Sequence, residues 1–355
     1  MSLSYLADSI HDAALAFGYE SCAAIPLALL DGFGVEVDRR LDSTPDDGLK
    51  EVDRAVFNNF GAFRRLATVY PWARAAVVAV MSYGVYQIPA PFKDRVAKYF
   101  CVDSRRDPNS REYLASAALE EFMVAKGLKV ETERKYGLLP LRWAAHKAGL
   151  GQGGRNNFFY TQKGSWVHLE AWLVDQKLER LTTSDLTPCP DGCRACQKNC
   201  PTGSLAEAYL TRPAKCLTFI NALRPVDWVE NPYSTAAGTW IFGCDQCQNV
   251  CPHNQGAWRE EREFPGLNEL AKDFSLERLV ALDYDYIRAN LAPKFWYITP
   301  DRAWQWKVNA LNALKNDWAK NAWPKDKDPV LRRALADESL EVQRMANWIL
   351  TLAKS

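Results

Sequence analysis

The residues best suited to chemistry in this sequence of 355 residues are its cysteines, because eight of the ten lie between Cys189 and Cys251. They form a first run, Cys189-x3-Cys193-x2-Cys196-x3-Cys200-Pro201, then a single Cys216, then a second run, Cys244-x2-Cys247-x3-Cys251-Pro252. Thiolates at such short spacing can wrap a metal centre, and proline after the last cysteine ends the loop because it has no backbone N–H to donate. The spacing predicts a segment that binds metal clusters.

Eight cysteines in this arrangement indicate two 4Fe-4S clusters. In bacterial two-cluster ferredoxins, three cysteines of a run hold one cube and the fourth, before proline, holds the other. Transferred to this sequence, that crossing assigns Cys189, Cys193, Cys196 and Cys251 to one cluster, and Cys200, Cys216, Cys244 and Cys247 to the second. The x3 spacing after Cys189 departs from the ferredoxin pattern. Disulfides are disfavoured in a reducing cytosol, and paired zinc sites would show Cys-x2-Cys doublets without the Cys-Pro ends.

Composition limits the other classes of function. The net charge is +1, from 44 basic and 43 acidic residues, so a partner that is a polyanion must be met by a local patch. The N-terminus predicts an amphipathic helix rather than a secretory signal, and no run of eighteen apolar residues occurs. We expect a cytoplasmic protein without contact to a membrane.

The segments on either side of the cysteines predict an α+β fold in three parts. We expect an α+β domain over 1–180, a ferredoxin-like double-cluster domain over 181–258 and a helical region over 259–355. The predicted elements are a buried strand over 74–84, a helix over 111–127 closed by glycine, and helices over 301–316, 328–337 and 340–353.

A glycine-rich loop, Gly149-Leu-Gly151-Gln-Gly153-Gly154, lies in the first part. It contains G-x-G-x-x-G, but a dinucleotide fingerprint follows a strand and opens a helix, whereas this loop follows a helix and opens a strand. We therefore reject nicotinamide binding. Two alternatives remain: bare backbone that a large flat ligand can approach, or a helix stop followed by a turn.

Several of these motifs occur together in one family. The succession "SYG", "AAHKAGLGQGGRN", "CRACQKNCPTGSL", Cys216, "FGCDQCQNVCPHN" and "KVNALNALKN" resembles the epoxyqueuosine reductase family, which is related to the reductive dehalogenases. The resemblance implies a nitroreductase-like cobalamin-binding domain, a double 4Fe-4S domain and HEAT-like helices that hold a tRNA anticodon arm. It also implies that electrons pass through the two clusters to a base-off cobalamin, which reduces a bound substrate.

The resemblance also directs attention to particular residues. Our candidates for holding cobalamin are Tyr83, His146, Gly149, Gly151, Gly154 and Arg155. The family's Asp-Tyr-His triplet, whose aspartate donates a proton, is missing after Lys98-Tyr99. The candidate replacements are Glu112 with Tyr113, at the start of the corresponding helix, and Asp103. A solvated acid at the helix start is the alternative for Glu112.

Two hypotheses of different classes follow. The first is an iron–sulfur and cobalamin-dependent reductase, supplied with electrons by a flavodoxin or ferredoxin. A tRNA substrate is implied by the resemblance, but the balanced net charge argues against it. The second is an electron-transfer or reductive-activator protein that serves a partner enzyme and reduces no substrate itself. In either case we expect a monomer.

Overall fold

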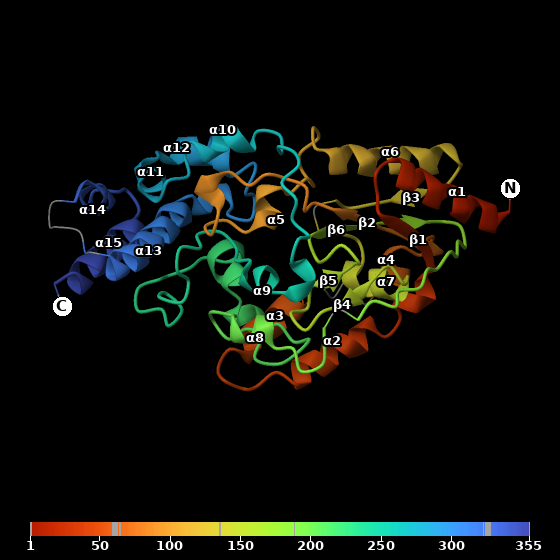
Figure 1. The fold of residues 1–355 in the computed structure, drawn as a ribbon, viewed down its shortest axis with the longest axis horizontal. Helices are drawn as coiled ribbons and strands as arrows, with labels where there is room; N and C mark the ends of the chain where they lie inside the picture. Colours follow the sequence, from red (N-terminus) through yellow and green to blue (C-terminus); the bar gives the residue numbers. More distant parts are fainter. Residues whose placement is uncertain are drawn as a thin grey trace.

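The computed structural model describes residues 2–58, 63, 65–134, 136–187, 189–321, 323 and 328–354. A sheet with helices on both faces lies at one end of the molecule and a group of helices at the other (Figure 1). The cysteine-rich segment, with the short helices α8 (Ala195–Lys198) and α9 (Gln246–Asn249), lies between them.

The sheet is antiparallel and has the strand order β1-β2-β6-β3. Its strands are β1 (Ser21–Pro26), β2 (Ala75–Ser82), β6 (Val167–Val174) and β3 (Val130–Glu131). All eight residues of β2 are buried, because both faces of the sheet are covered. This confirms the buried strand expected from the apolar run at 74–84.

Alternate residues of β2 and β6 supply two separate cores, as the pleat of a strand requires. One face packs on α1 (Leu3–Ala16) and α6 (Arg111–Ala125), and the opposite face packs on α7 (Leu141–Lys147). The helix predicted over 111–127 is confirmed: Ser110 caps its first turn, and Gly127 follows it with φ of 83°.

Shorter elements complete the first part of the chain. They are α2 (Phe33–Asp42), α3 (Lys50–Asn58), α4 (Leu66–Val69), α5 (Lys98–Cys101), β4 (Gln152–Gly153) and β5 (Phe159–Tyr160). Strand β4 lies within the glycine-rich loop, and it pairs with β5 as a separate two-stranded sheet.

The C-terminal part is helical, as the sequence predicts. Its helices are α10 (Leu267–Ala271), α11 (Leu276–Ala281), α12 (Tyr284–Tyr286), α13 (Trp304–Lys320), α14 (Pro329–Leu335) and α15 (Leu340–Leu352). Helix α13 packs between α11 and α15. The HEAT-like arrangement and the division of the chain at residues 180 and 258 stay predictions. None of the helices in the described part of the chain combines the length and the apolar character that crossing a bilayer requires.

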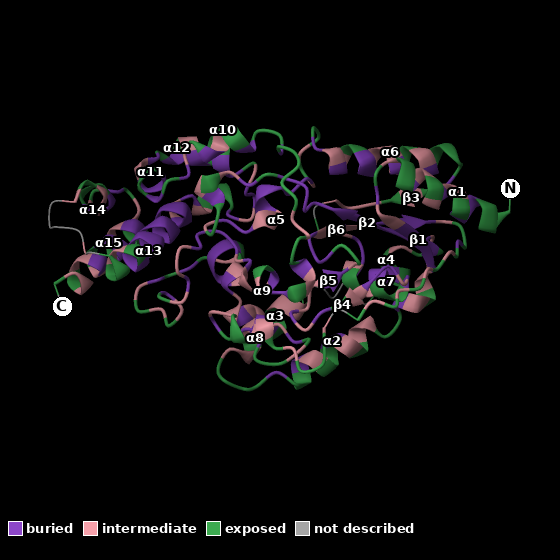
Figure 2. Ribbon diagram, viewed as in Figure 1, coloured by how far each residue is buried: buried purple, intermediate pink, exposed green. Residues whose placement is uncertain are grey.

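Helix α13 is buried around almost its whole circumference, including its polar residues (Figure 2). Its amide side chains satisfy backbone groups of the irregular loops that follow Cys216. Asn309 Oδ1 accepts from Trp228 Nε1 at 2.8 Å, and its Nδ2 donates to the carbonyls of Asn221 and Ile241, both at 2.8 Å. Buried polar groups must be paired in this way, since an unpaired one loses its bond to water without replacement.

We expect Asn309→Ala to lower the free energy of unfolding by about 2–4 kcal/mol, because it leaves the Ile241 carbonyl and the Trp228 indole N–H buried without partners and leaves the Asn221 carbonyl with Gln305 as its remaining side-chain donor. Chemical denaturation under anaerobic conditions measures this change. Asn347→Ala is the matched control: its amide donates to Gln343 O at the surface, so the loss should stay within about 0.5 kcal/mol. Equal effects of the two substitutions would contradict the role given to Asn309.

Candidate functional site

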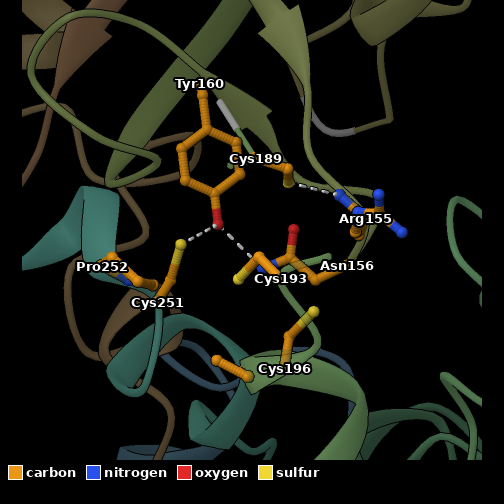
Figure 3. Close-up of a pocket in the computed structure, with 9 residues that line it drawn as sticks. Arg155, Asn156, Tyr160, Cys189, Cys193, Cys196, Cys251 and Pro252 are labelled. Carbon is orange, nitrogen blue, oxygen red and sulfur yellow. Dashed lines mark hydrogen bonds between the residues drawn. The ribbon is translucent and has the colours of Figure 1, made fainter. Parts of the chain in front are cut away.

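The four cysteines predicted to hold the first cluster line a single pocket. Figure 3 shows Cys189, Cys193, Cys196 and Cys251 around it, together with Arg155, Asn156, Tyr160 and Pro252. The lining contains thiols and no carboxylate. Thiolates are the ligands that hold iron–sulfur clusters, so the donor set fits a 4Fe-4S cube.

The other four cysteines also lie near one another. Burial raises the pKa of Cys247 well above its usual value, and the neighbouring Cys216, Cys244 and Cys200 raise it further. The pKa of Cys244 is raised by burial too, with Cys216 and Cys200 again nearby. The structure thus groups the eight cysteines as the sequence predicts, and their role as ligands stays a prediction. Among the described residues, no three histidine, cysteine or acidic side chains converge closely enough to hold a single metal ion.

Two groups from outside the cysteine-rich segment contact the first set of sulfurs. The hydroxyl of Tyr160 donates to Cys251 Sγ at 3.1 Å, and the backbone N–H of Arg155 donates to Cys189 Sγ at 3.3 Å (Figure 3). Sequence reasoning missed Tyr160 and gave Arg155 a different role, in cobalamin binding. The available signal was their position directly after the glycine-rich loop.

The glycines of that loop face the chain's own atoms. A Cβ on Gly149 would lie 1.9 Å from the carbonyl oxygen of Thr182, and one on Gly151 would lie 2.1 Å from that of Tyr160. A Cβ on Gly154 would lie 2.4 Å from the Tyr160 ring. Cβ atoms essentially never approach other atoms this closely, so Gly149 and Gly151, which face backbone, accept glycine alone, whereas a Cβ on Gly154 would have to displace the Tyr160 ring.

The remaining candidates for cobalamin do not adjoin the loop in a common cradle. His146 is exposed on α7, whereas Tyr83 is buried beyond the end of β2 among other aromatic rings. These residues therefore form no common cradle in the structure, and their role in binding a corrin ring stays a prediction.

Glu112 is buried, with a relative exposure of 1% at the start of α6. Its Oε2 accepts from the Tyr86 hydroxyl at 2.7 Å, and its Oε1 accepts from Arg111 Nη2 at 2.8 Å. The alternative of a solvated acid is therefore wrong. Tyr113 points elsewhere, since its ring is half-buried and lies 5.4 Å from the Arg134 guanidinium.

Asp103, the other candidate acid, is also buried and lies in the loop after α5. Arg105 Nη2 donates to its Oδ2 at 2.7 Å. Burial by itself raises the pKa of Asp103, but the hydrogen bonds and charge of Arg105 outweigh that effect, so the pKa lies below its usual value. Asp103 is therefore ionised at neutral pH, and its charge is balanced by Arg105.

Near these two acids lies His168, a residue that sequence reasoning did not select. It stands on β6 opposite Met81, and its ring centroid lies 4.7 Å from that of Tyr83 and 5.4 Å from that of Tyr99. Within the described part of the chain, its buried Nε2 has no hydrogen-bond partner. Burial lowers the pKa of His168, although the carboxylates of Glu112 and Asp103 act against this. The imidazole is therefore neutral at pH 7, and its Nε2 is a buried polar atom that the described residues leave unpaired.

Comparison with known proteins agrees with this geometry. Residues 189–254 match the family described as a 4Fe-4S double cluster binding domain. An epoxyqueuosine reductase of Bacillus subtilis is 28% identical over 289 residues, which are 75% of this chain and 71% of that one. An enzyme of the same name from Listeria monocytogenes is 33% identical over 144 residues, 39% of this chain. The chain is thus similar in sequence to epoxyqueuosine reductases.

The share of the matched protein that aligns with this chain differs between the sequence matches and the solved structures. The matched segments of the Listeria monocytogenes and Staphylococcus aureus proteins span 37% and 32% of their lengths, about a third. The solved structures cover more. An epoxyqueuosine reductase from Bacillus subtilis aligns with a TM-score of 0.67 at 19% identity, over 99% of this chain and 100% of that one.

A second epoxyqueuosine reductase structure, solved with an epoxyqueuosine-modified tRNA stem loop, aligns over 100% of both chains with a TM-score of 0.66 and 19% identity. These alignments show the mixed α/β fold of epoxyqueuosine reductases in this chain. Enzymes of that name are oxidoreductases, and the double-cluster domain confirms the expected iron–sulfur clusters.

The packing of the glycine loop can be tested directly. Gly149→Ala should lower the free energy of unfolding by about 2–4 kcal/mol, because the new Cβ meets the Thr182 carbonyl and because the φ of +74° is strained for alanine. Gly153→Ala, in the same loop, is the control: nothing lies within 4 Å of its Cβ position. Denaturant titration of both variants measures the difference, and similar stabilities would contradict the packing role.

Proposed function

We propose that this chain is an iron–sulfur-dependent reductase of the epoxyqueuosine reductase type. In this proposal two 4Fe-4S clusters deliver electrons toward the buried side chains of Glu112, Asp103 and His168. The observation that carries the proposal is the grouping of the eight cysteines into two sets of four. The common fold with epoxyqueuosine reductases supports it.

Reduction of an epoxide requires a buried site with a proton donor. Reducing an epoxide to an alkene consumes two electrons and two protons, breaks both C–O bonds of the ring and releases water. Each cluster passes one electron at a time, so the chain must hold the substrate until both have arrived. The protein's own task is to exclude water, position the oxygen and deliver protons.

Glu112 is the acid best placed for proton delivery. Tyr86 and Arg111 fix its carboxyl group by hydrogen bonds, and its burial keeps bulk water away. The free Nε2 of His168 can hydrogen-bond a polar atom of the bound substrate. Arg105 holds the pKa of Asp103 below its usual value, so Asp103 contributes a negative charge beside His168 and is less suited to donating a proton. One of the structures of like fold is described as having an aspartate catalytic loop swung out of its active site, which supports a carboxylic acid as the catalytic group.

Cobalamin is the cofactor that the resemblance implies, and it would supply a strongly reducing cobalt centre. The residues chosen for it do not form a cradle, since Gly149, Gly151 and Gly154 pack on the chain itself and His146 is exposed. We therefore assign no step to cobalamin. The proposal depends on the clusters and on the buried acids Glu112 and Asp103.

The substrate class follows from the structure of like fold that holds an epoxyqueuosine-modified tRNA stem loop. We take an epoxide carried by a tRNA stem loop as the first substrate to test, with a flavodoxin or ferredoxin as the electron donor. The protein in this proposal acts as a monomer in the cytoplasm.

Metal analysis tests the cluster content. After anaerobic purification from cells supplied with cobalamin, we expect about eight irons per chain, with cobalt measured in the same sample. Cys251→Ser should lower the iron content to about four, because one cube loses a ligand. Cys22→Ser, at a buried cysteine of β1 far from the two runs in sequence, should retain the full content. A purified chain without iron would overturn the proposal.

Substitution of Glu112 tests its role as the proton donor. We expect Glu112→Gln to slow reduction of the epoxide by about 100-fold or more, because the amide cannot donate a carboxyl proton. Mass spectrometry of the nucleoside product under single-turnover conditions measures the rate. Glu121→Gln, exposed on the same helix, is the control. Iron content should be unchanged in both variants, and an unchanged rate for Glu112→Gln would exclude Glu112 as the donor.

Because the glycine loop packs on the chain itself rather than on a ligand, a second candidate function is that of an electron-transfer protein. A protein of that class would bind about eight irons and donate electrons to a partner. It would leave the epoxide unchanged in the same single-turnover assay, with no dependence on Glu112.

A further inference from the structure

We propose that the glycine-rich loop and Tyr160 set the reduction potential of the cluster held by Cys189, Cys193, Cys196 and Cys251. The hydroxyl of Tyr160 does so through its hydrogen bond to Cys251 Sγ. This inference rests on the proposed function for its assignment of the four cysteines as ligands. It gives the loop a role that neither the resemblance nor the double-cluster domain assigns to it.

The direction of the hydrogen bond is fixed by Asn156. Its Nδ2 donates to the Tyr160 oxygen at 2.9 Å, so the hydroxyl proton must point elsewhere, and Cys251 Sγ lies 3.1 Å away. The orientation of the amide is fixed in turn, because Asn156 Oδ1 accepts from the backbone N–H of Phe158 at 3.2 Å. Tyr160 is therefore a donor to sulfur (Figure 3).

The glycines make this position of Tyr160 accessible. A Cβ on Gly151 would collide with the Tyr160 carbonyl and one on Gly154 would collide with its ring, at 2.1 and 2.4 Å. The same loop brings the backbone N–H of Arg155 to Cys189 Sγ. One loop thus aims two donors at two sulfurs of the same set.

A donor at a ligand sulfur stabilises the reduced cluster. Reduction adds one electron to the cube without making or breaking a bond, and the added negative charge is shared by the ligand sulfurs. Hydrogen bonds to those sulfurs favour that charge and raise the potential. Tyr160 is 1% exposed, so the bond acts where water does not screen it.

Redox titration followed by EPR tests the inference on the anaerobic chain with both clusters bound. Tyr160→Phe removes only the hydroxyl, and we expect one of the two clusters to shift to a more negative potential while the other stays unchanged. Tyr284→Phe is the matched control. It also removes a buried tyrosine hydroxyl, one that donates to Asp337 in the helical part, and both potentials should stay at their original values.

A second variant approaches the same bond from the loop. Gly154→Ala displaces the Tyr160 ring without removing its hydroxyl, and it should shift the same cluster in the same direction. Unchanged potentials in Tyr160→Phe with full iron content would overturn the inference and leave the proposed function standing. Loss of one cluster in Tyr160→Phe would also overturn it, since the hydroxyl would then serve assembly rather than tuning. An unaltered chain that binds no iron would overturn the proposed function itself.

Discussion

The arrangement of eight buried or half-buried cysteine side chains in two sets is the constraint on which the rest of the structure depends. Burial raises the pKa of Cys216, Cys244 and Cys247, so their thiols stay protonated until iron displaces the proton. The segment that carries them cannot enforce this arrangement alone, because its two α-helices, α8 and α9, have four residues each. The surrounding parts of the chain must hold its loops in place.

Buried amide side chains do this from two sides. Asn309 of α13 binds the carbonyls of Asn221 and Ile241, and Asn156 after the glycine loop binds that of Cys247 at 3.2 Å. An amide offers two N–H donors and one carbonyl acceptor, so a single side chain can satisfy several groups of an irregular loop. This explains why α13 is polar and yet buried. The helix packs on loops whose backbone needs partners, rather than on another apolar surface.

How far the sequence predicts this structure depends on how local each cause is. Cysteine spacing is a property of one short segment, and the buried strand and the C-terminal helices follow from local periodicity, so all were predicted correctly. The glycine loop was ambiguous, because a missing Cβ admits a ligand and a carbonyl equally. That the carbonyl belongs to Thr182, more than thirty residues from Gly149, depends on tertiary packing. The burial of Glu112 depends on Tyr86 and Arg111 in the same way, and His168 carried no local signal at all.

The turn between β5 and β6, closed by the pairing of Thr161 with Gly164, connects the two halves of the candidate site. Tyr160, in β5, contacts Cys251, while His168, eight residues later in β6, lies near the carboxylates of Glu112 and Asp103. Strand β6 pairs with β2 along its whole length, from Ala75 opposite Val174 to Ser82 opposite Val167. The register of a buried sheet cannot slip by one residue without turning every side chain to the opposite face. The pairing of β6 with β2 therefore fixes which face of the sheet His168 occupies, and the short turn before β6 keeps Tyr160 near that end of the strand.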